Sequence, residues 1–175
     1  ITHRKGLIFD ENLMNRFFCA INQVEDQKGC LLVQFPPSIR IGQFKQVQNL
    51  IQLLRNHNVK EEWKIALEFR HPSLYIPEVY ELLHNYKSGL VIHDKGISST
   101  PIMDLDKDFV YLRFHGPDGN YRGSYDDDVL YEYSTYIVDW LSQNKQVYVY
   151  CNNTMGNAYD NLTALKTMVK SNYKV

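Results

Sequence analysis

Apolar residues follow two different periods along this chain. In some short stretches they are continuous over strand length, and between these stretches they recur every three or four positions, as on one face of a helix. The continuous stretches predict strands within residues 29–35, 63–69, 89–93, 109–114 and 146–151. The helical spacing predicts helices within residues 13–24, 41–54, 79–86, 129–141 and 158–169. In the first of these the apolar face is expected to hold Leu13, Phe17, Ala20, Ile21 and Val24. Strands that alternate with helices indicate an α/β fold whose strands are parallel and joined by right-handed crossovers.

Two architectures fit this order of elements. One is an open doubly wound sheet, and the other is part of an eight-stranded (β/α) barrel. A length of 175 residues is within the usual range of one domain, so we expect a single domain over residues 1–175. The chain has no initiator Met, and Ile1-Thr2-His3 leads directly into structured sequence, so we expect it to be a portion of a longer polypeptide.

Three connections carry further signals. Asp10 precedes the first helix and is expected to cap it. The connection 94–108 is rich in turn residues and shows no strong helix pattern. The loop 115–125 combines glycines with Tyr121 and Tyr125, a composition typical of a mobile cover over a ligand, and it matches no phosphate-loop motif.

Polar side chains follow every predicted strand at the point where it ends. Because the carboxyl ends of parallel strands meet at one face, where the active sites of barrels and open sheets are found, we expect these side chains to converge. Any one of them can equally cap the next helix or satisfy a loop backbone, but together they favour a ligand site. In chain order they are Gln34, Glu68, Arg70, His71, His93, Asp94, Arg113, His115, Asn152 and Asn153.

The chemistry of this set favours an anionic ligand and acid–base catalysis. Arg70 and Arg113 suit bidentate hydrogen bonds to a phosphate or carboxylate. The candidate catalytic residues are Glu68, His93 and His115, of which Glu68 and His115 would exchange protons. The alternative for Glu68 is a structural ion pair with an arginine. The candidate substrate-binding residues are Gln34, Arg70, His71, Asp94, Arg113, Tyr121, Tyr125, Asn152 and Asn153.

A divalent metal is a second interpretation of the same side chains. Imidazole and carboxylate groups are ligands that suit zinc or manganese. The two arginines of the set would add positive charge to the same face, so we favour an anion over a metal. The side chains concerned are Glu68, His71, His93, Asp94 and His115.

Charge and cysteine content narrow the class of protein. Lys and Arg number 19 and Asp and Glu number 20, and this net charge of -1 gives no general attraction for nucleic acid or an anionic membrane. No stretch approaches the roughly 18 apolar residues of a membrane span. Cys19, Cys30 and Cys151 lack metal-ligand spacing and are expected to be reduced thiols, which favours a cytoplasmic location.

Several segments resemble the YecE-like family, also called domain of unknown function 72. They are GCLLVQFPPS at 29–38, LEFRHPS at 67–73, YLRFHG at 111–116, YRGSY at 121–125 and NNT at 152–154. This resemblance runs through nearly the whole chain and implies a TIM-like barrel, about three of whose strands precede residue 1. Leu74 stands where the family usually has Trp, and Cys151 where it usually has Phe, which concerns packing more than the polar set.

The resemblance implies no reaction, because the activity of that family is unassigned. Our first hypothesis is a hydrolase or lyase acting on a small anionic substrate, such as a phosphorylated one, with His93 and Asn152 orienting it. The first alternative resembles metal-dependent barrel endonucleases, with Glu68, His93 and His115 on the metal and the 115–125 loop on a DNA backbone. The second alternative is a non-catalytic module that binds a metabolite in the same pocket.

Overall fold

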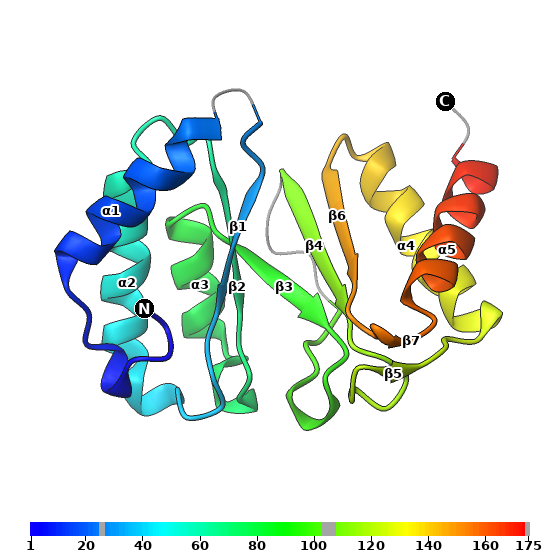
Figure 1. The fold of residues 1–175 in the computed structure, drawn as a ribbon, viewed down its shortest axis with the longest axis horizontal. Helices are drawn as coiled ribbons and strands as arrows, with labels where there is room; N and C mark the ends of the chain where they lie inside the picture. The colour runs from blue at the N-terminus through cyan, green and yellow to red at the C-terminus, as the bar shows by residue number, and fades with distance from the viewer. Residues whose placement is uncertain (25–26, 103–107, 174–175) are drawn as a thin grey trace. The chain divides into compact units, whose positions relative to one another are not determined.

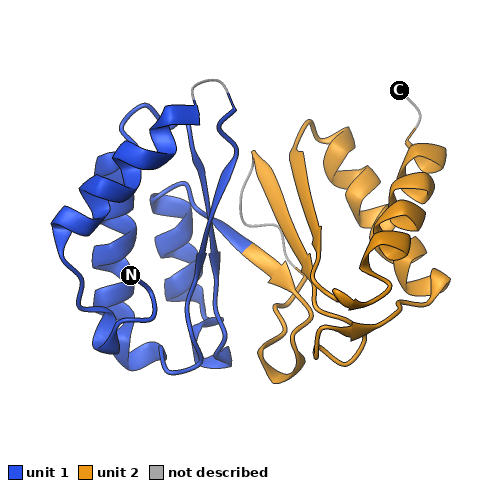
Figure 2. Ribbon diagram, in the orientation of Figure 1, with its two compact units in different colours: residues 1–90 blue, residues 91–175 orange. Residues whose placement is uncertain are grey.

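The computed structural model describes residues 1–24, 27–102 and 108–173. Their contacts divide the chain into two compact units, residues 1–90 and 91–175 (Figure 2). Each unit has its own strands and its own covering helices (Figure 1). The expectation of a single domain stays a prediction.

Five parallel strands follow one another in the order β1-β2-β3-β4-β6. Within unit 1, β3 pairs with β2 through Gly89 and Leu90, and within unit 2 it pairs with β4 through Val91, Ile92 and His93. The α/β class and the parallel pairing are therefore confirmed, and each predicted strand is found within one residue of its expected ends. The bounds are β1 (Cys30–Gln34), β2 (Lys64–Glu68), β3 (Gly89–His93), β4 (Phe109–Phe114) and β6 (Gln146–Cys151).

In unit 1 the helices lie on one side of β1 and β2 (Figure 1). They are α1 (Glu11–Ile21), α2 (Phe44–His57) and α3 (Pro77–Asn85). The Asp10 carboxylate accepts the Asn12 backbone N–H at 2.9 Å, which confirms the predicted cap of α1.

The buried face of α1 differs from the predicted one. The sequence pattern favoured a stripe through Phe17, whereas Met14 and Phe18 are buried and Phe17 is 39% exposed. Two apolar stripes, offset by one residue, overlap in this helix, and periodicity alone cannot choose between them. Phe18 lies on the buried face because its ring stacks on His57 of α2, with 5.4 Å between ring centroids.

In unit 2, α4 (Asp127–Ser142) and α5 (Ala158–Asn172) pack together over one face of β4 and β6 (Figure 1). The alternate residues Val110, Leu112 and Phe114 of β4 point into this core, as the period of two in a strand requires. Tyr111, one position out of phase, stacks instead on Tyr150 of β6, with ring centroids 4.9 Å apart. The helices therefore cover one face of β4, and its other face carries the residues in phase with Tyr111.

A short parallel ladder that the sequence did not predict ties two loops of unit 2 together. It pairs β5 (Arg122–Gly123) with β7 (Met155–Gly156). The backbones approach so closely that a Cβ on Gly156 would lie 2.3 Å from the Gly123 carbonyl oxygen, which explains the glycine at this position. The ladder joins the loop after β4 to the loop after β6.

Two other sequence expectations concern segments outside the main elements. In the connection 94–108, residues 96–98 form a 3₁₀ turn, and residues 103–107 lie outside the described residues. None of the helices in the described ranges is long and apolar enough to cross a membrane.

Candidate functional site

Unit 2 brings several of the predicted strand-end residues into contact. His93 lies in register with Arg113 on the neighbouring strand, and Arg113 lies in register with Tyr150. The Arg113 Nε–H donates to the Asn152 side-chain oxygen at 3.2 Å. The rings of His93 and His115 meet edge to face, with 5.7 Å between centroids. The ends of β3, β4 and β6 therefore form a polar cluster within this unit.

Asp94 is the centre of this cluster. Its Oδ1 accepts the backbone N–H of His115 at 2.7 Å and lies 3.3 Å from His115 Nδ1. Its other oxygen, Oδ2, accepts the Tyr125 hydroxyl. A carboxylate beside Nδ1 holds the imidazole proton on that nitrogen, so Nε2 of neutral His115 is an acceptor. This pairing is the arrangement in which a carboxylate orients a histidine for proton transfer.

Tyr125 holds Asp94 from the side opposite His115. Its hydroxyl accepts the Gly116 backbone N–H at 2.6 Å, and its ring packs edge to face on Phe114. Burial and the bond to Asp94 both raise the pKa of Tyr125, so the hydroxyl stays a neutral donor. With both sides of the hydroxyl engaged, the geometry favours a positioning role, and the predicted role of Tyr125 in substrate binding stays a prediction.

The loop predicted as a mobile cover is anchored over its second half. Tyr121 donates its backbone N–H to the His115 carbonyl at 2.6 Å and accepts the Met155 N–H at 3.1 Å. The β5–β7 ladder follows directly, and the rings of Tyr121 and His115 pack edge to face with 5.4 Å between centroids. These contacts with Tyr121 help to bury His115 fully.

Asn153 belongs to the anchor of this loop. Its side-chain N–H groups donate to the Gly123 carbonyl at 3.0 Å and to the Asn161 side-chain oxygen at 2.9 Å. Asn161, on α5, also accepts the Tyr125 backbone N–H at 3.3 Å. These contacts give the Asn153 side-chain N–H groups a structural role, and the predicted role of Asn153 in substrate binding stays a prediction. Asn161 was missed because an asparagine in a helix has no signal that distinguishes it from a surface residue.

Lys95 is the second residue of the cluster that sequence reasoning missed. Its ammonium donates to the Gly119 carbonyl at 3.0 Å and lies 3.8 Å from the centroid of the Tyr121 ring. Its backbone N–H donates to His93 Nδ1 at 3.2 Å. The signal was available, since Lys95 directly follows Asp94 at the end of β3.

In unit 1, the strand-end residues mainly contact one another. Glu68 and Arg70 form an ion pair whose side chains are 0% and 4% exposed, the arrangement considered as the structural alternative for Glu68. His71 Nδ1 accepts the Ser73 backbone N–H at 3.2 Å and so caps the 3₁₀ turn 72–74. These contacts favour structural roles for all three residues.

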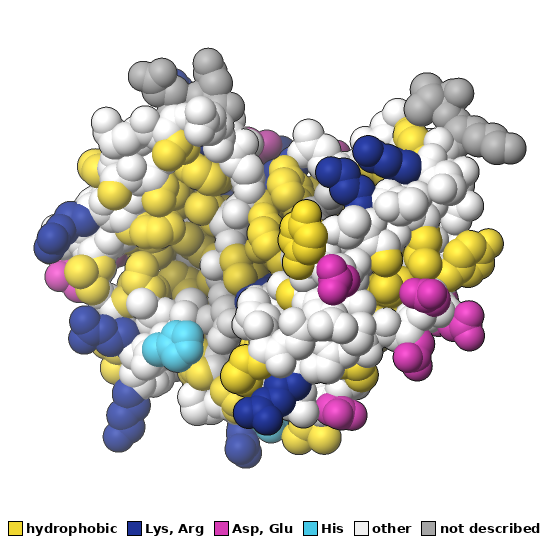
Figure 3. Space-filling model, turned by 45° about the vertical axis from the view of Figure 1, so that its right-hand side comes forward, with side chains coloured by type: hydrophobic (Ala, Val, Ile, Leu, Met, Phe, Trp, Pro, Cys, Tyr) yellow, Lys and Arg dark blue, Asp and Glu magenta, His cyan; other side chains and the backbone are white. Residues whose placement is uncertain are grey.

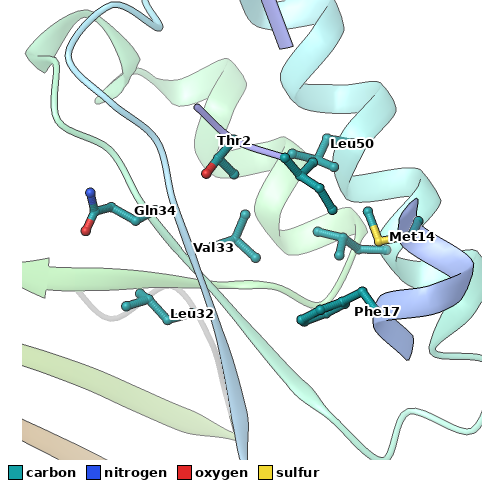
Figure 4. Close-up of a pocket in the computed structure, with 9 residues that line it drawn as sticks. Thr2, Met14, Phe17, Leu32, Val33, Gln34 and Leu50 are labelled. Atoms are coloured by element: carbon teal, nitrogen blue, oxygen red, sulfur yellow. The ribbon is translucent and has the colours of Figure 1, made fainter. Parts of the chain in front are cut away.

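Gln34 lies in register with Glu68 at the end of β1, and its side chain lines a cavity of unit 1 (Figure 4). The cavity has a volume of about 290 Å³ and is mostly apolar, with Met14, Phe17 and Leu32 among its walls. Gln34 and Thr2 supply polar groups there. This environment suits an apolar group better than an anion.

The described part of the chain shows no metal cluster, and the net charge of the sequence is close to zero. Across residues 1–24, 27–102 and 108–173, no group of three His, Cys, Asp or Glu side chains is arranged to hold a metal ion. The face drawn in Figure 3 carries both basic and acidic side chains, in keeping with the net charge of -1. An anion would therefore be held by individual basic residues.

Cysteine reactivity tests the electrostatics around Asp94. Burial, and then the charge of Asp94, raise the pKa of the Cys151 thiol to about 11, while Cys19 is exposed. A thiol with that pKa is roughly one-thousandth thiolate at about pH 8, so we expect iodoacetamide to label Cys19 first and Cys151 far more slowly. Labelling of Cys151 should accelerate as the pH rises toward about 11, measured by peptide mass spectrometry. Equal rates at the two cysteines near pH ~8 would contradict this reading.

Comparisons with known proteins give one consistent answer. A family model described as "Protein of unknown function DUF72" matches residues 1–175. A crystal structure of a DUF72 family protein from Enterococcus faecalis V583 is similar with a TM-score of 0.79 and 19% identity, over 95% of this chain and 68% of that chain. One from Thermotoga maritima MSB8 has a TM-score of 0.77 and 26% identity, over 91% of this chain and 65% of that chain. No curated protein gives a significant match.

Proposed function

This chain belongs to the DUF72 family of proteins of unknown function, as its motifs indicated, and we propose that it is part of a hydrolase or lyase acting on a small anionic substrate. The chain spans 65% of the length of the T. maritima relative, so the reaction is proposed for the whole protein. The proposed frame is a TIM-like barrel, because five parallel strands that alternate with helices are compatible with one. In such a barrel the polar cluster of unit 2 lies at the carboxyl ends of the strands, where substrates bind.

The observation that carries the proposal is the contact of Asp94 with both the backbone and Nδ1 of His115. Asp94 fixes the tautomer and stabilises the imidazolium when His115 Nε2 takes a proton from substrate or water. Tyr125 positions Asp94 through its neutral hydroxyl. Proton transfer is thus assigned to His115, since the buried pair with Arg70 favours a structural role for Glu68.

The anionic class of the substrate is supported by the basic residues of the same unit. Arg113 is half-buried beside Asn152 at the end of β4, and its planar guanidinium suits a phosphate or carboxylate. The endonuclease alternative gains no support, because the described residues offer no metal cluster and the net charge gives no attraction for nucleic acid.

The test is a turnover screen of the protein with a panel of phosphate monoesters and other small anionic metabolites. We expect consumption of one class of anion, with an Arg113→Ala variant raising KM by about tenfold or more through the loss of a charged hydrogen bond. Arg16→Ala, an exposed residue of α1, is the matched control and should leave KM unchanged. If a ligand binds and is recovered unchanged, the protein is a binding module and not an enzyme.

A further inference from the structure

Lys95 carries a charge that its neighbours do not neutralise. Its ammonium contacts a backbone carbonyl, that of Gly119, and the face of the Tyr121 ring. Among the residues that the structure describes, no carboxylate forms an ion pair with it. A ring face and one carbonyl are weak partners for a half-buried ammonium compared with an anion. The surroundings of Lys95 therefore favour a negatively charged ligand.

The position of Lys95 relates this charge to the proposed proton-transfer residue. The Lys95 backbone N–H is held by His93 Nδ1, and the residue before it, Asp94, holds His115. The Tyr121 ring contacts both groups, since its face lies under the Lys95 ammonium and it packs edge to face with the His115 ring. An anion that displaced the Tyr121 ring from Lys95 would thus arrive beside His115.

The backbone around Tyr121 is fixed while its side chain is exposed. Tyr121 has a φ of 68°, its backbone is held through His115 and Met155, and the residue as a whole is 36% exposed. Gly119 is pressed against Gly96, where a Cβ would lie 2.7 Å from the Gly96 nitrogen. The two partners of Lys95 are therefore a fixed carbonyl and a ring that can rotate about its own side-chain bonds without moving the loop.

We propose that Lys95 is an anion-binding residue of this site and that a phosphate group on the ligand takes the place of the Gly119 carbonyl and the Tyr121 ring. The proposal rests on the proposed function for the anionic class of the substrate. A phosphate adds the attraction between opposite charges, which the uncharged Gly119 carbonyl and Tyr121 ring cannot supply, and this drives the exchange of partners. Rotation of the Tyr121 ring away from Lys95 then opens a path to His115.

The first test is a calorimetric titration of the protein with inorganic phosphate. We expect Lys95→Met, which keeps the length of the side chain and removes its charge, to weaken binding by about tenfold or more. Lys95→Arg should retain affinity within about threefold, because it keeps a charged donor. Lys166→Met, an exposed lysine of α5, is the matched control and should bind as the wild type does. Wild-type protein that binds no phosphate, or Lys95→Met that binds it as tightly as Lys166→Met, would overturn the proposal.

The second test follows the Lys95 side chain by NMR. In the free protein, the ε-methylene protons should be shifted upfield by the Tyr121 ring, and Tyr121→Leu should remove this shift. Saturating phosphate should also remove it in the wild type. Phosphate binding with the Lys95 resonance unmoved would overturn the exchange of partners. Both tests measure binding, so they can succeed even if the turnover screen finds no reaction, and they can fail while turnover by His115 is found.

Discussion

His115→Gln is expected to lower kcat for the anionic substrate by about 100- to 10,000-fold, the usual contribution of a general acid–base group. Glutamine is close to histidine in size and can hydrogen-bond to Asp94, but it cannot take up a proton near neutral pH. KM should change little, because the anion is bound by basic residues rather than by His115. The measurement is steady-state turnover of the substrate class that the screen identifies.

Asp94→Asn separates the orientation of His115 from its chemistry. Asparagine keeps the shape of the side chain and an oxygen for the His115 backbone N–H, but it removes the charge beside Nδ1. We therefore expect a loss of kcat that approaches that of His115→Gln. Removing this charge should also lower the pKa of Cys151 and accelerate its alkylation, a readout independent of turnover.

Controls distinguish these effects from loss of the fold. His84→Gln, on the exposed face of α3, should leave kcat unchanged. The thermal unfolding transition of each variant is compared with that of the wild type, because His115 is fully buried and its replacement can disturb packing. Only variants that keep the wild-type transition are compared in turnover. If folded His115→Gln turns over substrate as fast as the wild type, the assignment of proton transfer to His115 is wrong.

The order of elements could be predicted from the sequence because it depends on local pattern. Continuous apolar runs and helical spacing located every strand of the five-stranded order and every long helix. What the pattern could not predict was the choice between overlapping faces, as in α1, where Met14 and Phe18 are buried in place of Phe17. That choice is made by contacts with α2, such as the stacking of Phe18 on His57, which are distant in the sequence.

The candidate site was predictable to the extent that it depends on strand ends. The rule that polar residues gather there correctly placed His93, Asp94 and His115 in one contacting cluster. It could not tell ligand-facing groups from structural ones, because that depends on partners far along the chain. The Asn153 side-chain N–H groups, for example, donate to Gly123 and Asn161, and Arg70 forms a buried ion pair with Glu68.

Loop residues were the hardest to interpret, since composition does not report tertiary anchoring. The glycines and tyrosines of 115–125 indicated a mobile cover, yet the ladder of β5 and β7 holds the second half of the loop through main-chain hydrogen bonds. Two-residue strands of this kind carry too few residues for an alternating pattern. Close backbone approach explains Gly116 and Gly119 without mobility of the loop.

Gly116→Ala is expected to destabilise unit 2 by about 3 to 5 kcal/mol, the sum of a strained backbone and an overpacked contact. Gly116 has a φ of 96°, and a Cβ there would lie 2.2 Å from the Arg122 carbonyl oxygen, an atom of the backbone that cannot rotate away. Relief would require the 116–122 segment to move, which would also stretch the bond from the Gly116 N–H to the Tyr125 hydroxyl. The measurement is urea unfolding followed by the fluorescence of the buried Trp140, with Trp63 of unit 1 replaced by Phe in every protein compared.

Gly96→Ala is the matched control, because it separates backbone conformation from space. Gly96 has a φ of 51°, also in the left-handed region, but no atom lies within 4 Å of the position of an added Cβ. It should therefore cost only about 1 to 2 kcal/mol. Equal losses for the two variants would mean that the contact with Arg122 contributes nothing. A larger loss of unfolding free energy at Gly116, together with slower turnover, would show that the close approach of the loop to its own backbone keeps Tyr125 against Asp94. Asp94 in turn holds His115 in the orientation that proton transfer requires.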